Sequence, residues 1–425
     1  MSLIAELTWR GMLHNVTPEL EETLNTKKVA GYIGVDPTAD AIHVGNLASL
    51  MLLVHFQRYG HKPFALVGGA TGMVGDPSGR SDERSLLTKE ALQHNVSCIK
   101  QQMEKLLCHG NDENPITIVN NYDWFKDMNV LDFLRDVGKH LTVNYMMAKD
   151  SVKSRLEKGI SFTEFSYQLI QGYDFYWLNK HHDCVVQFGG SDQWGNITAG
   201  TELIRRMAGG EAHAFTCPLV TKSDGTKFGK TAGGAVWLDP EKTSPYQFYQ
   251  FWIRASDADA QKYIRVFTLL DKETIEGIEA EHDQDRGQRL LQKTLAKEVT
   301  AMVHGTAVCD KALATSEKLF SVKNKESLLA LDDNELKDFL ADFPNTFHLD
   351  KTGHGDSLTV VDLISTETGI LKSKGEARRS LKENAISINM EKVGVDAEVT
   401  AKDLLLDKYL LVQKGKKNKY LVVVE

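Results

Sequence analysis

Two segments of the chain have residue types that bind phosphate groups. His43-Val44-Gly45-Asn46 directly precedes an amphipathic stretch, so its backbone N–H groups would lie at the positive end of a helix dipole. Lys227-Phe228-Gly229-Lys230-Thr231 lies between Gly225 and the pair Gly233-Gly234, which gives two ammonium groups a backbone that can change conformation. A capping His-Gly pair and a solvated Lys/Gly turn would explain the two segments taken singly. Together they predict a nucleotide site.

A βαβ pattern over residues 29–67 places the first segment at a sheet edge. VAGYIGV and PFALVGG have strand length, and the stretch between them has apolar residues at helical spacing, namely Leu47, Leu50, Met51 and Val54. The same order recurs where ITIV precedes NNYDW (116–124) and where CVVQF precedes GGSDQWGN (184–196), with a helix expected from Ile197 to about Met207. This alternation predicts a parallel, Rossmann-like α/β sheet with ligands at the carboxyl ends of its strands.

Four parts are expected along the 425 residues, because the chain is too long for one hydrophobic core. The catalytic sheet domain is expected at 1–225, with a mostly helical insertion at about 80–165. A helical domain at 226–320 follows from the Ser244-Pro245 helix start and from apolar residues repeating at 291, 295, 299 and 303. A charged connector with a weak helix is expected at 321–355, and a small α+β domain at 356–425.

The last domain is electrically distinct from the rest of the chain. The net charge is −8, yet residues 356–425 contain 12 Lys and Arg against 11 Asp and Glu. Ser373 and Glu376 predict a capping box for a basic helix, and YLLVQ and KYLVVV predict a hairpin around KGKKN. The basic residues of the helix and hairpin, which form a local patch available to a polyanion, are Arg378, Arg379, Lys382, Lys414, Lys416, Lys417 and Lys419. The alternative is a solvated face with lysines that protect a sheet edge.

Cysteine usage and hydropathy bear on the compartment. Five cysteines without a CxxC pair favour reduced thiols and a cytoplasmic protein. The N-terminus resembles neither a signal peptide nor a transit peptide, and no run has membrane-spanning length. His181-His182-Asp183-Cys184 suggests a metal site, but no second cluster has matching spacing, so a surface loop is favoured and no protein-bound zinc is expected.

The two phosphate-binding segments resemble the HIGH and KMSKS signatures of class I aminoacyl-tRNA synthetases, in the expected order and about 180 residues apart. Four longer strings are similar to tyrosyl-tRNA synthetases of bacterial type: YIGVDPTAD (32–40), LVGGATGMVGDPSG (66–79), FTEFSYQLIQGYDF (162–175) and GGSDQWGN (189–196). The resemblance implies a dimer built on the 80–165 insertion with Trp124, Phe125 and Phe133. It also implies an anticodon-binding role for 226–320 and an S4-like RNA-binding module at 356–425.

Site residues follow from this resemblance position by position. Tyr32 and Asp174 would hold the phenol hydroxyl of tyrosine, since a phenol needs one donor and one acceptor in an apolar slot. Asp76, Tyr167 and Gln171 would surround its ammonium group, and Gln193 would lie near its carboxylate. The residues implied for ATP are Gly34, Asp36, His43, Gly45, Asn46, Gly190, Asp192, Lys227, Phe228, Gly229, Lys230 and Thr231.

The implied reaction is attack of the tyrosine carboxylate on the α-phosphorus of ATP, followed by transfer to tRNA(Tyr). The residues implied to stabilise the phosphate charge are Thr38, His43, Asn46, Arg84, Lys227 and Lys230. Mg²⁺ would accompany ATP, and a role for Arg80 stays open. Asn46 replaces the second His of HIGH, and Phe228-Gly229 replace Met-Ser. An amide still donates to phosphate, and both lysines are present.

Three other functions share part of these features. An inactive RNA-binding protein with a synthetase-like body would not need the complete pocket. A tryptophanyl-tRNA synthetase should lack the Tyr32/Asp174 pair, and a small-molecule nucleotidyltransferase would not need the helical and C-terminal domains.

Overall fold

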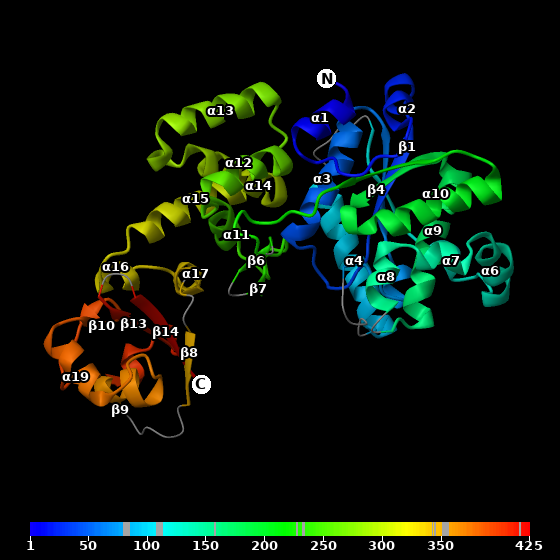
Figure 1. Ribbon diagram of the computed structural model, residues 1–425. Coiled ribbons are helices and arrows are strands. Elements are labelled where there is room, and N and C mark those ends of the chain that lie inside the picture. The colour runs from blue at the N-terminus through cyan, green and yellow to red at the C-terminus, as the bar shows by residue number, and fades with distance from the viewer. Residues whose placement is uncertain are drawn as a thin grey trace. The chain divides into compact units, whose positions relative to one another are not determined.

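The computed structural model describes residues 1–79, 86–107, 114–156, 159–226, 228–231, 234–341, 343, 346–350, 357–415 and 418–425. Figure 1 shows the chain coloured from its N-terminus to its C-terminus. Two compact units form: one of Met1–Thr231 with Ala235–Thr306, the other mainly of Ala307–Glu425. The finer division into four parts stays a prediction.

The first unit contains a five-stranded sheet in which every pairing is parallel, as the sequence predicts. The strand order is β3-β2-β1-β4-β5. In chain order the strands are β1 (Ala30–Val35), β2 (Lys62–Val67), β3 (Thr117–Asn120), β4 (Cys184–Gly190) and β5 (His213–Cys217). Because all five strands run the same way, their carboxyl ends meet at one edge. Tyr32 is in register with Phe64 on one side and Gln187 on the other.

Helices cover both faces of this sheet, as Figure 1 shows. One face packs against α3 (Val44–Arg58) and α4 (Lys89–Leu106), and the other against α9 (Phe162–His182) and α10 (Trp194–Ala208). Gly31 faces α3, where an added Cβ would lie only 2.7 Å from the Phe56 ring. Its neighbour Tyr32 points to the opposite face and meets the Phe175 ring of α9 at 5.5 Å.

Within the expected insertion at 80–165, the described elements are helices apart from the edge strand β3. Four short helices follow that strand: α5 (Tyr122–Phe125), α6 (Val130–Asp136), α7 (Val143–Met147) and α8 (Asp150–Leu156). A buried, bidentate pair between Arg155 and Glu164 joins α8 to α9, with N–O distances of 2.9 and 2.8 Å. The pair neutralises both buried charges, while Arg155 Nε bonds to no described residue.

A helical bundle completes the first unit: α11 (Pro245–Ile253), α12 (Asp257–Phe267), α13 (Lys272–Gln284) and α14 (Leu290–His304). Ser244 caps α11 ahead of its first-turn proline, as predicted. Two helices at the N-terminus, α1 (Leu3–Trp9) and α2 (Leu20–Thr26), precede the sheet. The buried Arg10, after α1, donates to the carbonyls of Arg265, Thr268 and Leu270, which fixes the end of α12.

The second unit begins with α15 (Thr306–Phe320), α16 (Lys325–Leu329) and α17 (Asp333–Ala341). Its sheet has the order β11-β10-β13-β14-β8. The strands are β8 (Thr346–Leu349), β10 (Ile386–Ile388), β11 (Glu391–Lys392), β13 (Tyr409–Lys414) and β14 (Asn418–Val424), with β9 (Ser357–Thr359) and β12 (Glu398–Thr400) paired separately. The segment expected as a connector thus contributes β8, which pairs with β14 through too few residues to be recognised as a strand in the sequence.

The basic helix and the final hairpin of this unit form as predicted. The helix is α19 (Lys374–Lys382), which packs with α18 (Val360–Asp362) over an apolar core, and the hairpin is β13 with β14. Ser373 caps α19 by accepting from the N–H of Glu376. The expected reciprocal bond differs, because the Glu376 carboxylate accepts from the N–H of Lys372 and not from that of Ser373. Among the described residues, no helix is long and apolar enough to cross a membrane.

Candidate active site

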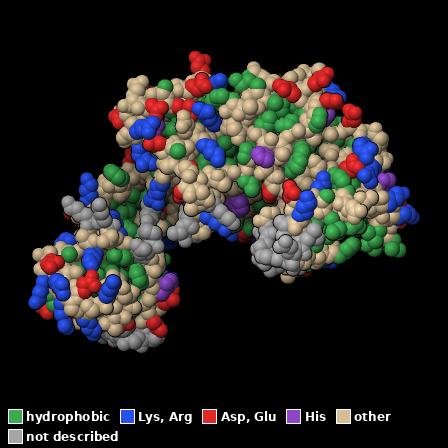
Figure 2. Space-filling view, in the orientation of Figure 1, with side chains coloured by type: hydrophobic (Ala, Val, Ile, Leu, Met, Phe, Trp, Pro, Cys, Tyr) green, Lys and Arg blue, Asp and Glu red, His purple; other side chains and the backbone are tan. Residues whose placement is uncertain are grey.

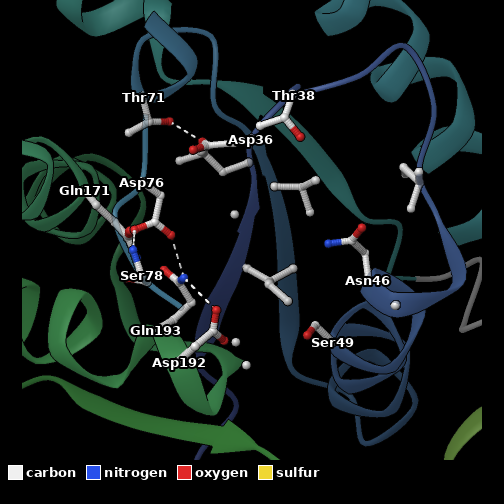
Figure 3. Close-up of a pocket in the computed structure, with 18 of the residues that line it drawn as sticks. Asp36, Thr38, Asn46, Ser49, Thr71, Asp76, Ser78, Gln171, Asp192 and Gln193 are labelled. Atoms are coloured by element: carbon white, nitrogen blue, oxygen red, sulfur yellow. Dashed lines mark hydrogen bonds between the residues drawn. The ribbon is translucent and has the colours of Figure 1, made fainter. Parts of the chain in front are cut away.

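A cavity of about 390 Å³ opens at the carboxyl ends of β1 and β4, where the sequence places the ligands. Its walls are the loops after β1 and β2, the first turn of α3, the inner face of α9 and the start of α10. Figure 3 shows Asn46 and Ser49 of α3 on one side, with Asp76, Gln171 and Gln193 opposite. The cavity thus brings together residues that lie more than 100 positions apart in the sequence.

A phenol and a carboxylate form the buried end of the cavity. Tyr32 and Asp174 are each 1% exposed and both line it. The Tyr32 hydroxyl makes no hydrogen bond to any described residue. Asp174 Oδ1 accepts from Trp124 Nε1 at 2.9 Å, and its Oδ2 accepts from Asn121 Nδ2 at 3.0 Å. Burial raises the pKa of Asp174 well above its usual range, and these two hydrogen bonds oppose that shift.

A network of amides and carboxylates lines the adjacent wall. Asp76 Oδ2 accepts from Gln193 Nε2 at 2.7 Å, while its Oδ1 accepts from the N–H of Ser78 and from Asn196 Nδ2. Figure 3 shows the Asp76–Gln193 bond as a dashed line. Gln171 also lines the cavity, beside Asp76 in this view. The wall presents acceptors, as a site for an ammonium group requires.

The hydroxyl of Tyr167 donates its hydrogen bond to another residue of the protein. It donates to Asp36 Oδ2 at 2.8 Å, and Thr71 donates to Asp36 Oδ1 at 2.6 Å. Burial raises the pKa of Tyr167, with the Asp36 charge adding to the shift, so the hydroxyl stays protonated. Tyr167 and Asp36 therefore act as a hydrogen-bonded pair that sets the loop after β1.

The first turn of α3 presents donors to the opposite side of the cavity. His43 is its N-cap, and Nδ1 accepts from the Gly45 N–H at 3.0 Å. Burial lowers the pKa of His43, and the Lys230 charge lowers it further. The neutral ring accepts at Nδ1 and therefore carries its proton on Nε2, which can donate to a ligand. A Cβ at Gly45 would lie 2.7 Å from the His43 ring, so only glycine leaves the imidazole in place.

The other residues expected to contact ATP surround this turn. Gly34, Thr38, Gly190 and Asp192 all line the cavity, with Thr38 exposed at the turn after β1. A Cβ on Gly190 would meet Asp192 Oδ1 at 2.5 Å, which explains why a side chain is excluded there. Burial raises the pKa of Asp192, and the nearby Asp76 charge contributes.

The second phosphate-binding segment is partly described. Lys230 is exposed in the short strand β6 (Lys230–Thr231), and Gly229 packs against the first turn of α3. Phe228 was expected to contact ATP, but its ring does not line the cavity. The ring is buried among aromatic rings of α11 and α12. Lys227, Arg80 and Arg84 lie outside the described residues, as does the side chain of Thr231.

Three polar residues that contact Asp174 or line the cavity were not identified as site residues from the sequence. Asn121 and Trp124 donate to Asp174, and the Trp124 ring also stacks on Trp177 with centroids 4.2 Å apart. Gln187 is 2% exposed and lines the cavity, and its Oε1 makes no hydrogen bond to a described residue. The sequence signal that could have identified Asn121 and Trp124 is their position, because NNYDW directly follows a strand of the same parallel sheet.

The basic residues of the second unit divide into solvated and engaged side chains. Arg378, Arg379 and Lys382 are exposed on α19, and Figure 2 shows Lys and Arg side chains on the surface of this unit. Lys414 instead pairs with Glu376 at 2.9 Å, and Lys419 lies over the Phe343 ring at 5.3 Å. Lys416 and Lys417 lie outside the described residues.

The candidate metal residues have other contacts. His181 and His182 end α9, and both rings pack on Trp177. Among the described residues no group of three His, Cys, Asp or Glu side chains is placed to hold a metal ion. Among the described residues, Cys98, Cys184, Cys217 and Cys309 form no disulfide.

Comparison with known proteins gives consistent matches over the full length. The family described as tRNA synthetases class I (W and Y) matches residues 24–321, and the tyrosine--tRNA ligase SYY-like C-terminal domain matches residues 335–423. The tyrosine--tRNA ligase of Porphyromonas gingivalis is 53% identical over 432 residues, with all of both chains covered. That of Flavobacterium johnsoniae is 51% identical over 429 residues, covering 100% of this chain and 99% of the relative.

A solved structure supports the fold of most of the chain. A C-terminally truncated mitochondrial tyrosyl-tRNA synthetase from Aspergillus nidulans superposes with a TM-score of 0.69 at 32% sequence identity. The match covers 75% of this chain and 94% of that one.

Proposed function

The chain belongs to the tyrosine–tRNA ligases of class I, and we propose that the cavity described above is where it activates its amino acid. The enzyme joins L-tyrosine to ATP, forming tyrosyl-adenylate and pyrophosphate, and transfers tyrosine to tRNA(Tyr) with release of AMP. The single observation that carries the site assignment is the buried pair of Tyr32 and Asp174. A phenol hydroxyl that bonds to no described residue faces a cavity that is also lined by a buried carboxylate.

This pair explains selection of tyrosine by hydrogen bonding. The hydroxyl of the substrate donates to the Asp174 carboxylate, and its oxygen accepts from the Tyr32 hydroxyl. The next wall, with Asp76 and Gln171, accepts from the substrate ammonium group. Phenylalanine would leave the buried Tyr32 hydroxyl unpaired and would offer no donor to Asp174, which costs more than the apolar contact of its ring can offset.

The phosphates of ATP would lie at the first turn of α3. His43 donates through Nε2 and Asn46 through its amide, while Lys230, Lys227 and Arg84 supply positive charge and Thr38 a hydroxyl. These groups stabilise the negative charge that moves onto pyrophosphate as the tyrosine carboxylate attacks the α-phosphorus. Asp36, Gly190, Asp192 and Gln193 would contact the ribose and the reacting carboxylate. Mg²⁺ would enter with the ATP phosphates.

Tyrosine binding to the Tyr32→Phe variant tests the site directly. We expect its dissociation constant for tyrosine, measured by equilibrium dialysis without ATP, to rise by about tenfold, since one hydrogen bond is lost. Phenylalanine binding should not weaken, because this ligand makes no bond to the hydroxyl. Equal loss for both amino acids, or none, would remove Tyr32 from the tyrosine site.

We further propose that the enzyme is a homodimer formed through α6 and α7. Val130, Leu131 and Leu134 on α6 and Val143 on α7 are 45–70% exposed, and Figure 2 shows hydrophobic side chains gathered over this region. Such a patch is typical of an interface in the isologous dimers that soluble enzymes form most often.

Sedimentation velocity at micromolar concentration tests the dimer. The unaltered protein should sediment as a dimer, and Leu131→Glu should shift it to the monomer because a charge would be buried in the interface. Leu329→Glu is the matched control, since Leu329 is 59% exposed on α16, and it should leave the dimer intact. A monomeric wild-type protein with full charging activity would contradict the proposal.

We propose that the second unit binds tRNA through Arg378, Arg379 and Lys382, together with Lys416 and Lys417 of the hairpin. Lys414 and Lys419 contribute less, because Glu376 and Phe343 engage them.

The expected location in the cytoplasm, where tRNA charging takes place, agrees with the absence of disulfides among the described cysteines.

Deleting residues 321–425 should separate the two half-reactions. Tyrosine activation is expected to stay within about twofold, while the KM for tRNA rises at least about tenfold and its dependence on salt becomes shallower. The cut precedes β8, because leaving this strand without β14 would expose an unpaired edge. Replacing Arg378, Arg379 and Lys382 with alanine in the full chain should reproduce part of the effect. An unchanged tRNA KM and salt dependence would show that the basic face is only solvated.

A further inference from the structure

Phe228 has an environment that its place in the phosphate-binding segment does not suggest. Its side chain is 8% exposed, although its sequence neighbours include Lys227 and Lys230. The ring stacks on Phe267 with centroids 5.2 Å apart and planes at 14°, and it meets Tyr263 edge-on at 4.9 Å. Phe251 and Trp252 complete the contacts at 5.6 and 5.9 Å. All four rings belong to α11 and α12.

The backbone next to this ring is fixed to a different element. Gly229 has a φ of +78°, and an added Cβ would lie 3.0 Å from Val44 Cγ2 and 3.3 Å from the Gly45 nitrogen. The Gly229 carbonyl accepts from the Val236 N–H at 3.0 Å, and the Val236 carbonyl accepts from the Val44 N–H at 2.9 Å. Gly229 therefore rests on the turn of α3 that is proposed to receive the phosphates.

Two anchors thus act on consecutive residues. The helical bundle holds the ring of Phe228, and the start of α3 holds the backbone of Gly229. Lys230 follows directly, and its charge acts on His43, whose pKa it lowers. Displacing the ring would let Gly229 and Lys230 move away from the phosphate site, although no atom of the ring lines the cavity.

We propose that Phe228 is a positioning residue for ATP, which holds Gly229 and Lys230 against the first turn of α3 by inserting its ring between α11 and α12. The bundle is then part of the nucleotide site without touching the nucleotide. This inference rests on the proposed role of Lys230 in binding phosphate. Its consequence is specific, since losing the ring should impair ATP use and leave tyrosine binding unchanged.

Phe228→Ala is the first variant, measured by tyrosine-dependent ATP–pyrophosphate exchange. We expect the KM for ATP to rise by about tenfold or more and the dissociation constant for tyrosine to stay within about twofold. Phe228→Met should recover most of the loss, because a thioether of similar volume keeps the contacts with the surrounding rings. Phe251→Ala should raise the KM for ATP less, and adding it to Phe228→Ala should have little further effect, as coupled residues require.

Phe248→Leu is the matched control for general loosening of the bundle. Phe248 is fully buried on α11 and contacts Trp252 and His304, with no ring contact to Phe228. It should lower the melting temperature and leave the KM for ATP unchanged. If Phe248→Leu raises the KM for ATP as much as Phe228→Ala at an equal loss of melting temperature, or if Phe228→Ala leaves ATP use intact, the proposal is overturned.

Amide hydrogen exchange gives a readout that does not require activity. In Phe228→Ala the amides of Val236 and Val44 should exchange at least about tenfold faster, because their bonds depend on the position of Gly229. Unchanged exchange at both amides would contradict the positioning role. If the unaltered enzyme catalysed no tyrosine-dependent ATP–pyrophosphate exchange, the proposed function of the site would be refuted. The amide hydrogen exchange would still decide the role of Phe228.

Discussion

Replacing Asp174 with asparagine is expected to lower kcat/KM for tyrosine activation by about 10²- to 10³-fold, with the KM for ATP unchanged. Both carboxylate oxygens already accept hydrogen bonds, from Trp124 at 2.9 Å and from Asn121 at 3.0 Å. An amide has one oxygen and one NH₂ group, so one of these donors would face another donor. The substrate hydroxyl would lose a charged acceptor at the same time.

Asp123→Asn is the control, because it makes the same chemical change in an exposed residue of α5. Its exchange kinetics should equal those of the unaltered enzyme. The melting temperature should be recorded for both variants. If the Asp174→Asn protein is folded and binds ATP normally, its loss of activity can be assigned to recognition of the tyrosine hydroxyl. Full tyrosine activity in that protein would show that Asp174 does not read the phenol.

The second large effect is expected for His43→Ala, which should slow formation of tyrosyl-adenylate by about 10²-fold. The neutral imidazole caps α3 through Nδ1, so its Nε2–H is available to the phosphates only while the ring stays in place. Alanine removes both the donor and the cap. Tyrosine binding should be unaffected, because Asp76 and Gln171, the residues proposed for the ammonium group, lie across the cavity from the first turn of α3 (Figure 3). Rapid-quench measurement of the first turnover checks this rate.

His43→Asn separates capping from catalysis. Asparagine is a good N-cap residue, so this variant should regain about 1 kcal/mol of the stability that alanine loses. Its shorter side chain does not carry the imidazole donor, and the rate of adenylate formation should stay low. If His43→Asn and His43→Ala both react at the unaltered rate, the histidine only caps the start of α3.

The sequence predicted the elements of the sheet because their signal is local. Apolar runs of strand length and the helical spacing from Leu47 to Val54 reflect burial on both faces, and β1, α3 and β2 form where these patterns lie. Family resemblance supplied Tyr32 and Asp174, which the structure brings to the same end of one cavity.

Contacts that depend on packing between distant segments could not be predicted in this way. Trp124 reaches Asp174 because β3 is placed two strands from β1, an order that no local pattern specifies. The Phe228 ring does not line the cavity, because aromatic rings more than 20 residues later in the sequence enclose it. Lys414 is neutralised by Glu376 because the hairpin packs near the start of α19. Each result required the tertiary arrangement.

Amino-acid-dependent ATP–pyrophosphate exchange with tyrosine, phenylalanine and tryptophan tests the central claim most directly. The account predicts strong exchange with tyrosine and negligible exchange with the other two, since neither presents a hydroxyl to Tyr32 and Asp174. Tyrosyl-tRNA synthetases are themselves the known example of this effect, with discrimination against phenylalanine of about 10⁵ without editing. Comparable exchange with phenylalanine or tryptophan, or none with tyrosine, would contradict the assignment of this cavity.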